Sequence, residues 1–406
     1  MKIFVKFKEK FLENIFFFMV LVYFTLSVFC IFRGVESAWA QSDALLCHIP
    51  YVKKVIEKGF LGALMYPLAV MPPFFHWVVA VTHKVTGLDI YLTGKLVSFL
   101  VSFFTLCVLG RFLQKKRISS RWSLFLSAMF CFSWAFLSSS VSPVTDSFAV
   151  SIYIFILMSI AHRNIKVLIL LVPVLIFTRQ QYVVISVALL LSVLISEFLS
   201  KKTKISSVER FNILVASLFG LMAIVFIFYV WGGFIPQQYR VGFSARNFLN
   251  LGALSLSITY VGFLILLASA MGVFSRFLLK ELALGLLISF FTFLILPTDY
   301  NKQEGRFGSI FWDLSSYVSI FGISIVSVLC GVYFFAFLYK LKKLLWVESL
   351  DGYGFIYLFL ILGFVGIFCL QKFCFLRYID PIVGLSFFFF IYHLSLNSKF
   401  RTLFTQ

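Results

Sequence analysis

The sequence predicts an all-α, polytopic membrane protein, and three observations lead to that prediction. Of its 406 residues, 61% are hydrophobic and only 13% are charged, whereas soluble proteins are about half apolar and about a quarter charged. The apolar residues fall in runs of about twenty, the length of a helix that crosses the roughly 30 Å hydrocarbon core of a bilayer. Because lipid offers no hydrogen-bond partner to an exposed backbone group, these runs are expected to be α-helices.

Twelve apolar runs are expected to span the membrane, which puts both chain termini on one side. Their approximate bounds are 14–33, 91–111, 122–139, 147–162, 165–178, 181–199, 211–231, 249–274, 280–296, 312–339, 353–371 and 379–397. The run over 72–86 is short for a span and opens with Pro72-Pro73. If it crossed the membrane, every later loop would change sides and most basic loop residues would move outside. The tendency of Lys and Arg to stay in the cytoplasm therefore predicts a juxtamembrane helix over 72–86.

Composition and charge also limit the organisation and the partners. The net charge of +19 is explained by basic cytoplasmic loops, so nucleic acid is not an expected partner. The seven cysteines form no CxxC pair, so neither a zinc site nor a disulfide framework is expected. One integral domain over 1–406 is the simplest interpretation, with 34–90 as its first outer loop. The start of the chain resembles a signal peptide with a cleavage pattern at Ala38-Trp39-Ala40, but a retained helix is favoured because Arg33 and Glu36 intervene.

The predicted topology gathers the unusual polar residues at the non-cytoplasmic ends of the spans. They come from five parts of the chain: Asp43 and His48, Ser142-Pro143-Val144-Thr145-Asp146, Thr178-Arg179-Gln180-Gln181, Pro236-Gln237-Gln238-Tyr239-Arg240, and the stretch from Gln371-Lys372 to Arg377-Tyr378. Polar side chains that reach one membrane face from distant parts of a chain are typical of a functional site.

The first outer loop carries the candidate for proton transfer. Asp43 follows the first span, seven residues after Glu36, and a positioned carboxylate can take a proton from a hydroxyl, a role worth about 10²–10⁴-fold in rate. The alternative is an ordinary solvated acid. His76 lies among aromatic residues, where an interface residue with a satisfied ring nitrogen is the more common role. The loop offers one acid rather than a pair, so the sequence favours no metal site, and a divalent cation stays open as a cofactor.

Two further stretches hold candidate binding residues with a structural alternative each. Thr145 and Asp146 open the fourth predicted span, where either side chain can cap the helix N-terminus. Arg179 stands at the outer end of an apolar run, where it can extend to the lipid headgroups or bind a phosphate with its planar guanidinium.

The remaining cations at the outer membrane edge are Lys95, Arg240 and Arg377. Each alone is the kind of residue that anchors a helix at the interface. Together with His48 they can form a cationic cradle for a phosphate leaving group.

Taken in order, these residues resemble the GT-C superfamily of membrane glycosyltransferases, and most of all the dolichyl-phosphoglucose-dependent α-1,2-glucosyltransferases. The matching features are Asp43 with His48-Ile49-Pro50, Tyr66-Pro67, Pro72-Pro73-Phe74-Phe75, Lys95-Leu96, Thr145-Asp146, Arg179-Gln180, and Arg377-Tyr378 with Pro381. The chain departs from that family in having a single acid, which stands one residue further from the histidine. It also has Gln181-Tyr182 in place of Thr-Asn, and the region 211–340 offers little to match.

The resemblance implies an inverting transfer of a hexose from a polyprenyl-phosphate carrier to a hydroxyl of a glycan or lipid-linked acceptor. Asp43 would be the catalytic base. Arg179, with Arg377 or Lys95, would hold the lipid phosphate, and Asp146 would position substrate hydroxyls. His48, Gln180 and Tyr378 would complete the substrate-binding set. The Phe-rich helices would bind the prenyl chain in the membrane, with the helix over 72–86 beside its access route.

Two other functional classes remain open. Twelve helices also fit a transporter or lipid flippase, although such proteins commonly show internal repeats and charges near the membrane midplane. A structural or assembly protein would not require acids and arginines at one face. The absence of an N-x-S/T sequon in the sequence favours a bacterial plasma membrane over the endoplasmic reticulum.

Overall fold

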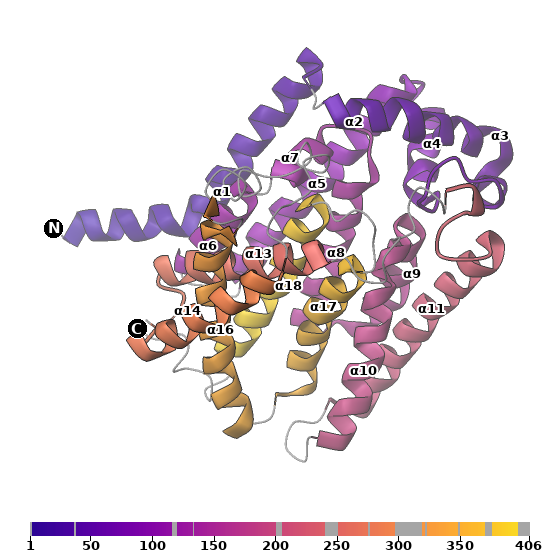
Figure 1. The fold of residues 1–406 in the computed structure, drawn as a ribbon. Helices are drawn as coiled ribbons and strands as arrows, with labels where there is room; N and C mark the ends of the chain where they lie inside the picture. The colour runs from indigo at the N-terminus through magenta and orange to yellow at the C-terminus, as the bar shows by residue number, and fades with distance from the viewer. Residues whose placement is uncertain are drawn as a thin grey trace.

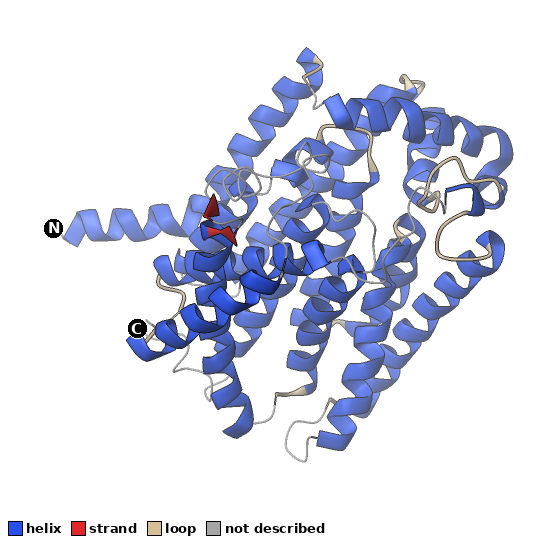
Figure 2. Cartoon of the chain, viewed as in Figure 1, coloured by secondary structure: helices blue, strands red, loops and turns tan. Residues whose placement is uncertain are grey.

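The computed structural model describes eleven stretches of the chain and is built almost entirely of α-helices (Figures 1 and 2). The described residues are 2–35, 38–115, 120–132, 134–199, 205–239, 251–274, 277–296, 319–320, 323–347, 350–369 and 376–396. The exception to helix and loop among them is a two-residue antiparallel pair, β1 (Ser319–Ile320) and β2 (Ile323–Ser324). The predicted all-α class is confirmed.

The helices of the described residues follow one another along the chain in a fixed order. Their bounds are α1 Lys2–Arg33, α2 Ala38–Asp43, η1 Ala44–His48, α3 Ile49–Met65, α4 Phe74–Thr86, α5 Ile90–Lys115, α6 Ser120–Phe132, α7 Trp134–Ser140, α8 Thr145–Ala161, η2 Ile165–Val167, α9 Leu168–Thr178, η3 Gln180–Tyr182, α10 Val183–Leu199, α11 Ser207–Trp231, η4 Gln237–Tyr239, α13 Leu251–Ala270, α14 Leu279–Ile295, α16 Ile325–Val347, α17 Gly352–Cys369 and α18 Leu376–Leu396.

Seven helical segments among the described residues are long and apolar enough to cross a membrane. They are Asn14–Arg33, Ile90–Lys115, Gln180–Glu197, Ser207–Trp231, Leu251–Ala270, Ile325–Lys342 and Gly352–Cys369, and the three shorter apolar helices are Thr145–Ala161, Ile165–Thr178 and Ile382–Leu396. The chain is therefore a multi-pass helical membrane protein. The total of twelve spans stays a prediction, because the run over 122–139 divides between α6 and α7 and residues 312–318 lie outside the described chain.

The segment predicted to lie along the membrane surface forms the thirteen-residue helix α4, which begins directly after Pro73. It ends at Gly87, whose φ of 69° is the left-handed conformation that glycine adopts without strain. The preceding helix α3 bends at Gly59, where φ is 71°. With α2, these helices lie together at one end of the bundle, at the top of the view in Figure 1.

At the opposite end of the bundle, three basic side chains contact neighbouring elements of the fold. The Arg121 guanidinium, at the start of α6, donates to the Gly272 carbonyl after α13 at 3.1 Å, a contact between residues 151 apart in sequence. The Lys340 ammonium lies 5.3 Å from the centre of the Phe277 ring, and the Arg163 guanidinium lies 5.0 Å from that of Tyr353. We call this the basic end, and it gathers loops that the charge pattern predicted to be cytoplasmic.

Glycines let several helices approach one another closely, as is common in membrane proteins, where packing rather than water expulsion drives helix association. A Cβ atom built on Gly262 of α13 would lie 2.1 Å from the Cys330 carbonyl oxygen of α16. A Cβ atom on Gly285 of α14 would lie 2.4 Å from the Val332 carbonyl oxygen. The backbones of α13, α14 and α16 therefore touch with no side chain between them.

We expect Gly262→Ala and Gly366→Ala to change stability in opposite directions. The first substitution forces two backbones apart and should cost about 1–3 kcal/mol. Gly366 of α17 has open space at its Cβ position, so alanine there should add about 0.5–1 kcal/mol through its better helix propensity. Thermal unfolding in detergent micelles measures both variants, and equal shifts would contradict the close approach of α13 and α16.

Candidate functional site

Asp43 and His48 are brought together by one irregular turn of helix. Helices α2 and α3 are joined by η1, a π-helical turn in which the Ile49 N–H donates to the Ala44 carbonyl. In an α-helix, residues five apart point about 140° away from each other, since each residue turns about 100°. The wider π turn pairs residue i with i+5, so the Asp43 Oδ2 and His48 Nε2 atoms lie only 3.6 Å apart. The extra residue noted between acid and histidine is absorbed by this turn.

His48 forms a buried hydrogen bond with His76 of α4. The Nδ1 atom of His48 and the Nε2 atom of His76 are 2.8 Å apart, and both side chains are fully buried. The Tyr51 ring packs on His76 with the ring centres 4.4 Å apart. Burial, and then the neighbouring His48, hold the pKa of His76 well below its ordinary value of 6.5. His76 is thus a neutral residue inside the site, and its aromatic neighbours were the only signal for it in the sequence.

The Asp43 carboxylate remains accessible next to this pair. Its side chain is 26% exposed, and the 3.6 Å to His48 is too long for a hydrogen bond. Burial, together with the charge and hydrogen bonding of Asp43, raises the pKa of the neighbouring Cys47 thiol to about 11. Cys47 therefore stays protonated near neutral pH, and it accompanies Asp43 as a weak donor rather than as a nucleophile.

A second polar cluster centres on Arg179, in the extended residue between α9 and η3. Its Nη2 atom lies 2.7 Å from Asp146 Oδ1, and its Nε donates to the Thr145 hydroxyl at 2.9 Å. The Thr145 hydroxyl in turn donates to the sulfur of Met71 at 3.3 Å. Neither Thr145 nor Asp146 caps α8, because the N-cap residue is Val144 and no side-chain cap is formed. The capping interpretation is therefore wrong, and both side chains serve Arg179 instead.

The two clusters lie at the same end of the molecule, on helices that pack together. α4 contacts both α3 and α9, and Met71, which accepts the Thr145 hydroxyl of the second cluster, stands five residues before His76 of the first. The charges of Asp43 and Arg179 both act on the pKa of His76, the first raising it and the second lowering it. Asp43 and Arg179, predicted to share a site, are thus both within electrostatic reach of one buried histidine.

Lys95 lies on α5 close to the turn that precedes α8. The neighbouring Gly94 approaches Pro143 so closely that a Cβ atom there would lie 2.5 Å from the Pro143 side chain. Lys95 is 5% exposed, and its ammonium lies 4.8 Å from the centre of the Tyr91 ring. α5 thus brings a buried cation to the end of the bundle that carries Thr145 and Asp146.

Gln180 has a structural task in this conformation. Its side-chain N–H group donates to the Val70 carbonyl at 2.7 Å and to the Phe234 carbonyl at 3.2 Å. It therefore ties together two outer loops. Arg377 and Tyr378 begin α18, but their side chains lie outside the described part of the structure, as does the whole of Arg240.

The side chains around Asp43 do not form a ligand set for a divalent cation. The facing nitrogens of His48 and His76 are occupied by their mutual hydrogen bond. Over the described stretches, no three His, Cys, Asp or Glu side chains gather closely enough to hold a metal.

We expect the stability of the protein to fall as the pH drops below about 6.5, and His76→Gln to reduce that fall. The unfolded chain takes up a proton on this histidine near 6.5, whereas the folded protein does so only at lower pH. Between these two values protonation favours the unfolded state, so stability decreases with decreasing pH. Melting temperatures in micelles from pH 7.5 to 5 measure the slope. The surface variant His83→Gln is the control, and an unchanged slope in His76→Gln would contradict the assignment.

We expect Asp146→Leu and Arg179→Met each to destabilise the protein strongly, and the double variant to be less affected than their sum. Both side chains are buried, so removing one leaves the other charge without its counterion, which costs about 3–5 kcal/mol. Unfolding of the four proteins of the cycle gives the coupling energy. Strictly additive effects would mean that the pair does not form.

No protein-family model matches the chain, and no curated protein or solved structure is significantly similar to it.

Proposed function

We propose that this protein is an inverting glycosyltransferase of the GT-C type. It moves a hexose from a polyprenyl-phosphate carrier to a hydroxyl acceptor on the non-cytoplasmic face of the membrane. The observation that carries the proposal is an accessible carboxylate, Asp43, that shares one end of the helical bundle with the buried Arg179. The resemblance of their surroundings to that superfamily agrees with it.

Asp43 is the base in this reaction. It takes the proton of the acceptor hydroxyl while the hydroxyl oxygen attacks the anomeric carbon from the side opposite the phosphate. The bond between that carbon and the phosphate oxygen breaks, its electron pair stays on the phosphate, and the configuration inverts. His76 is neutral and buried, and it hydrogen-bonds to His48, the imidazole that lies 3.6 Å from this acid.

The cations hold the polyprenyl phosphate that leaves. Arg179 is already balanced by Asp146 at 2.7 Å, so this carboxylate fixes the orientation of the guanidinium. The excess positive charge that the phosphate requires then falls to Lys95 and, by the resemblance, to Arg377. Preorganised donors of this kind are worth about 2.7–4 kcal/mol each when they meet charge that develops in a transition state.

The outer helices can also hold the prenyl chain. The π turn that faces Asp43 and His48 inward leaves Leu45 52% and Leu46 74% exposed, and Trp77 and Val85 of α4 are exposed as well. Exposed apolar side chains on short helices at a bilayer surface favour immersion in the interface. The carrier lipid can therefore reach the site from within the membrane.

We expect Asp43→Asn to lower sugar transfer by about 10²–10⁴-fold, the usual contribution of a positioned base. The assay incubates purified protein with polyprenyl-phosphate hexoses and a mixed lipid-linked acceptor fraction, and measures release of polyprenyl phosphate. Glu57→Gln, an exposed acid on the adjoining helix α3, is the matched control and should retain full activity.

Two outcomes would overturn the proposal. Full activity of the Asp43→Asn protein would remove this residue as the base. Movement of a labelled lipid across vesicles by the wild-type protein, without release of polyprenyl phosphate from any donor, would instead identify a transporter or lipid flippase.

A further inference from the structure

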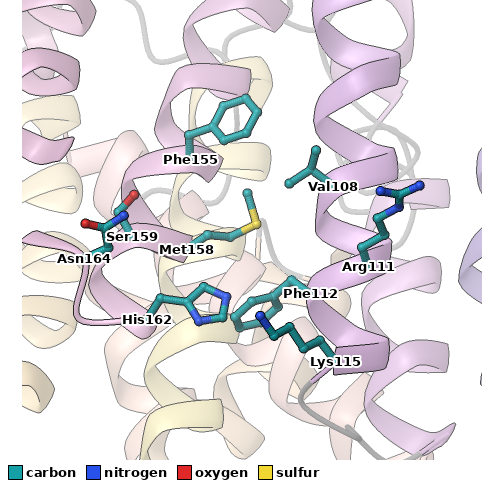
Figure 3. Close-up of a pocket in the computed structure, with 9 residues that line it drawn as sticks. All are labelled: Val108, Arg111, Phe112, Lys115, Phe155, Met158, Ser159, His162 and Asn164. Atoms are coloured by element: carbon teal, nitrogen blue, oxygen red, sulfur yellow. The ribbon is translucent and has the colours of Figure 1, made fainter.

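A pocket of about 380 Å³ lies between α5 and α8 at the basic end. It is at the opposite end of α8 from Thr145 and takes no part in the proposed transfer. Nine residues line it (Figure 3): Val108, Arg111, Phe112 and Lys115 from α5, Phe155, Met158, Ser159 and His162 from the end of α8, and Asn164 after it.

The pocket is apolar on one side and polar on the other. In Figure 3, Phe155 and Val108 stand at one side, and His162 and Lys115 stand at the other. The apolar pair lies about two helical turns before the ends of α8 and α5, which is deeper in the membrane. The Phe112 ring and the His162 imidazole pack edge to face, with their centres 5.0 Å apart. This contact keeps the imidazole at the polar side of the pocket. The pocket thus has the polarity of the boundary between headgroups and acyl chains.

The positive charges of the pocket have no counterion among its walls. Arg111 and Lys115 are four residues apart on one helix face, where like charges repel, and none of the nine lining residues is acidic. Their position near the C-terminus of α5 is ordinary, but it does not explain why both residues line one pocket. Arg163, in the turn after α8, differs, because it stacks on Tyr353 and interacts with Asp351.

We propose that this pocket binds an anionic phospholipid, with its phosphate between Arg111 and Lys115 and one acyl chain along Val108 and Phe155. The apolar surface continues along α5 to Phe104, which is 62% exposed and whose ring centre lies 6.2 Å from that of Phe155. A soluble phosphate compound would use only the polar side of the pocket. Basic pockets between membrane helices on the cytoplasmic side are known to bind anionic headgroups.

The test counts lipids retained by the purified protein in native mass spectra during titration with phosphatidylglycerol or with phosphatidylcholine. We expect retention of phosphatidylglycerol in preference to phosphatidylcholine. Arg111→Gln and Lys115→Gln should each weaken phosphatidylglycerol binding about fivefold, the effect of one basic side chain at a membrane surface. Lys166→Gln, an exposed lysine at the same end that does not line the pocket, is the matched control and should stay within about twofold of the wild type.

Three results would overturn the proposal. Unchanged binding in both pocket variants would exclude the pocket, and an equal loss in Lys166→Gln would indicate general surface attraction. Displacement of the lipid by millimolar glycerol phosphate would indicate a site for soluble phosphates. Because Arg111 and Lys115 are exposed, their variants should fold, and Phe104→Ser gives a second, uncharged test of the acyl-chain groove. The measurement needs no sugar transfer, so its outcome is independent of the proposed activity.

Discussion

The hydrogen bond between His48 and His76 is the contact on which the rest of the site depends. Both imidazoles are fully buried, and a buried polar group that loses its partner costs about 1–3 kcal/mol. Each ring therefore restricts where the helix of the other can lie. His76 also packs on Tyr51, and the charges of Asp43 and Arg179 both act on its pKa. One pair of rings thus relates the acid on the first outer helices to the arginine after α9.

The polar groups at this end of the bundle are largely satisfied within the protein, and the exceptions indicate where a ligand would act. Arg179, Asp146 and Thr145 bond to one another, and Gln180 bonds to two backbone carbonyls. In the described chain, the buried atoms His76 Nδ1 and Asp146 Oδ2 have no hydrogen-bond partner. Water or substrate hydroxyls commonly satisfy such atoms in native proteins. Their presence at the end of the bundle that carries Asp43 agrees with a site that is completed by its substrate.

Helix positions followed from the sequence because apolar run length and the bilayer thickness are linked by simple geometry. Charge predicted that 72–86 does not cross the membrane, and α4 is a helix of thirteen residues, shorter than a span requires. The partners of Thr145 and Asp146 could not be predicted from the sequence. A Thr-Asp step at the start of a helix is compatible both with capping and with an ion pair to a distant residue. The His48–His76 pair was also missed, since periodicity within a helix says nothing about which two helices meet.

The π turn between Asp43 and His48 makes the length of this segment more important than its composition. Most positions within Ala44–Cys47 can vary in side chain without changing which way the acid points, because the direction is set by how many residues the turn holds. A regular α-helix over the same residues would place Asp43 about 140° around the helix axis from His48, whereas removing one residue would let a regular α-helix keep the two side chains on one face as i,i+4 neighbours. The number of residues in this turn, together with its helix type, therefore decides whether the acid and the imidazole share one face of the helix.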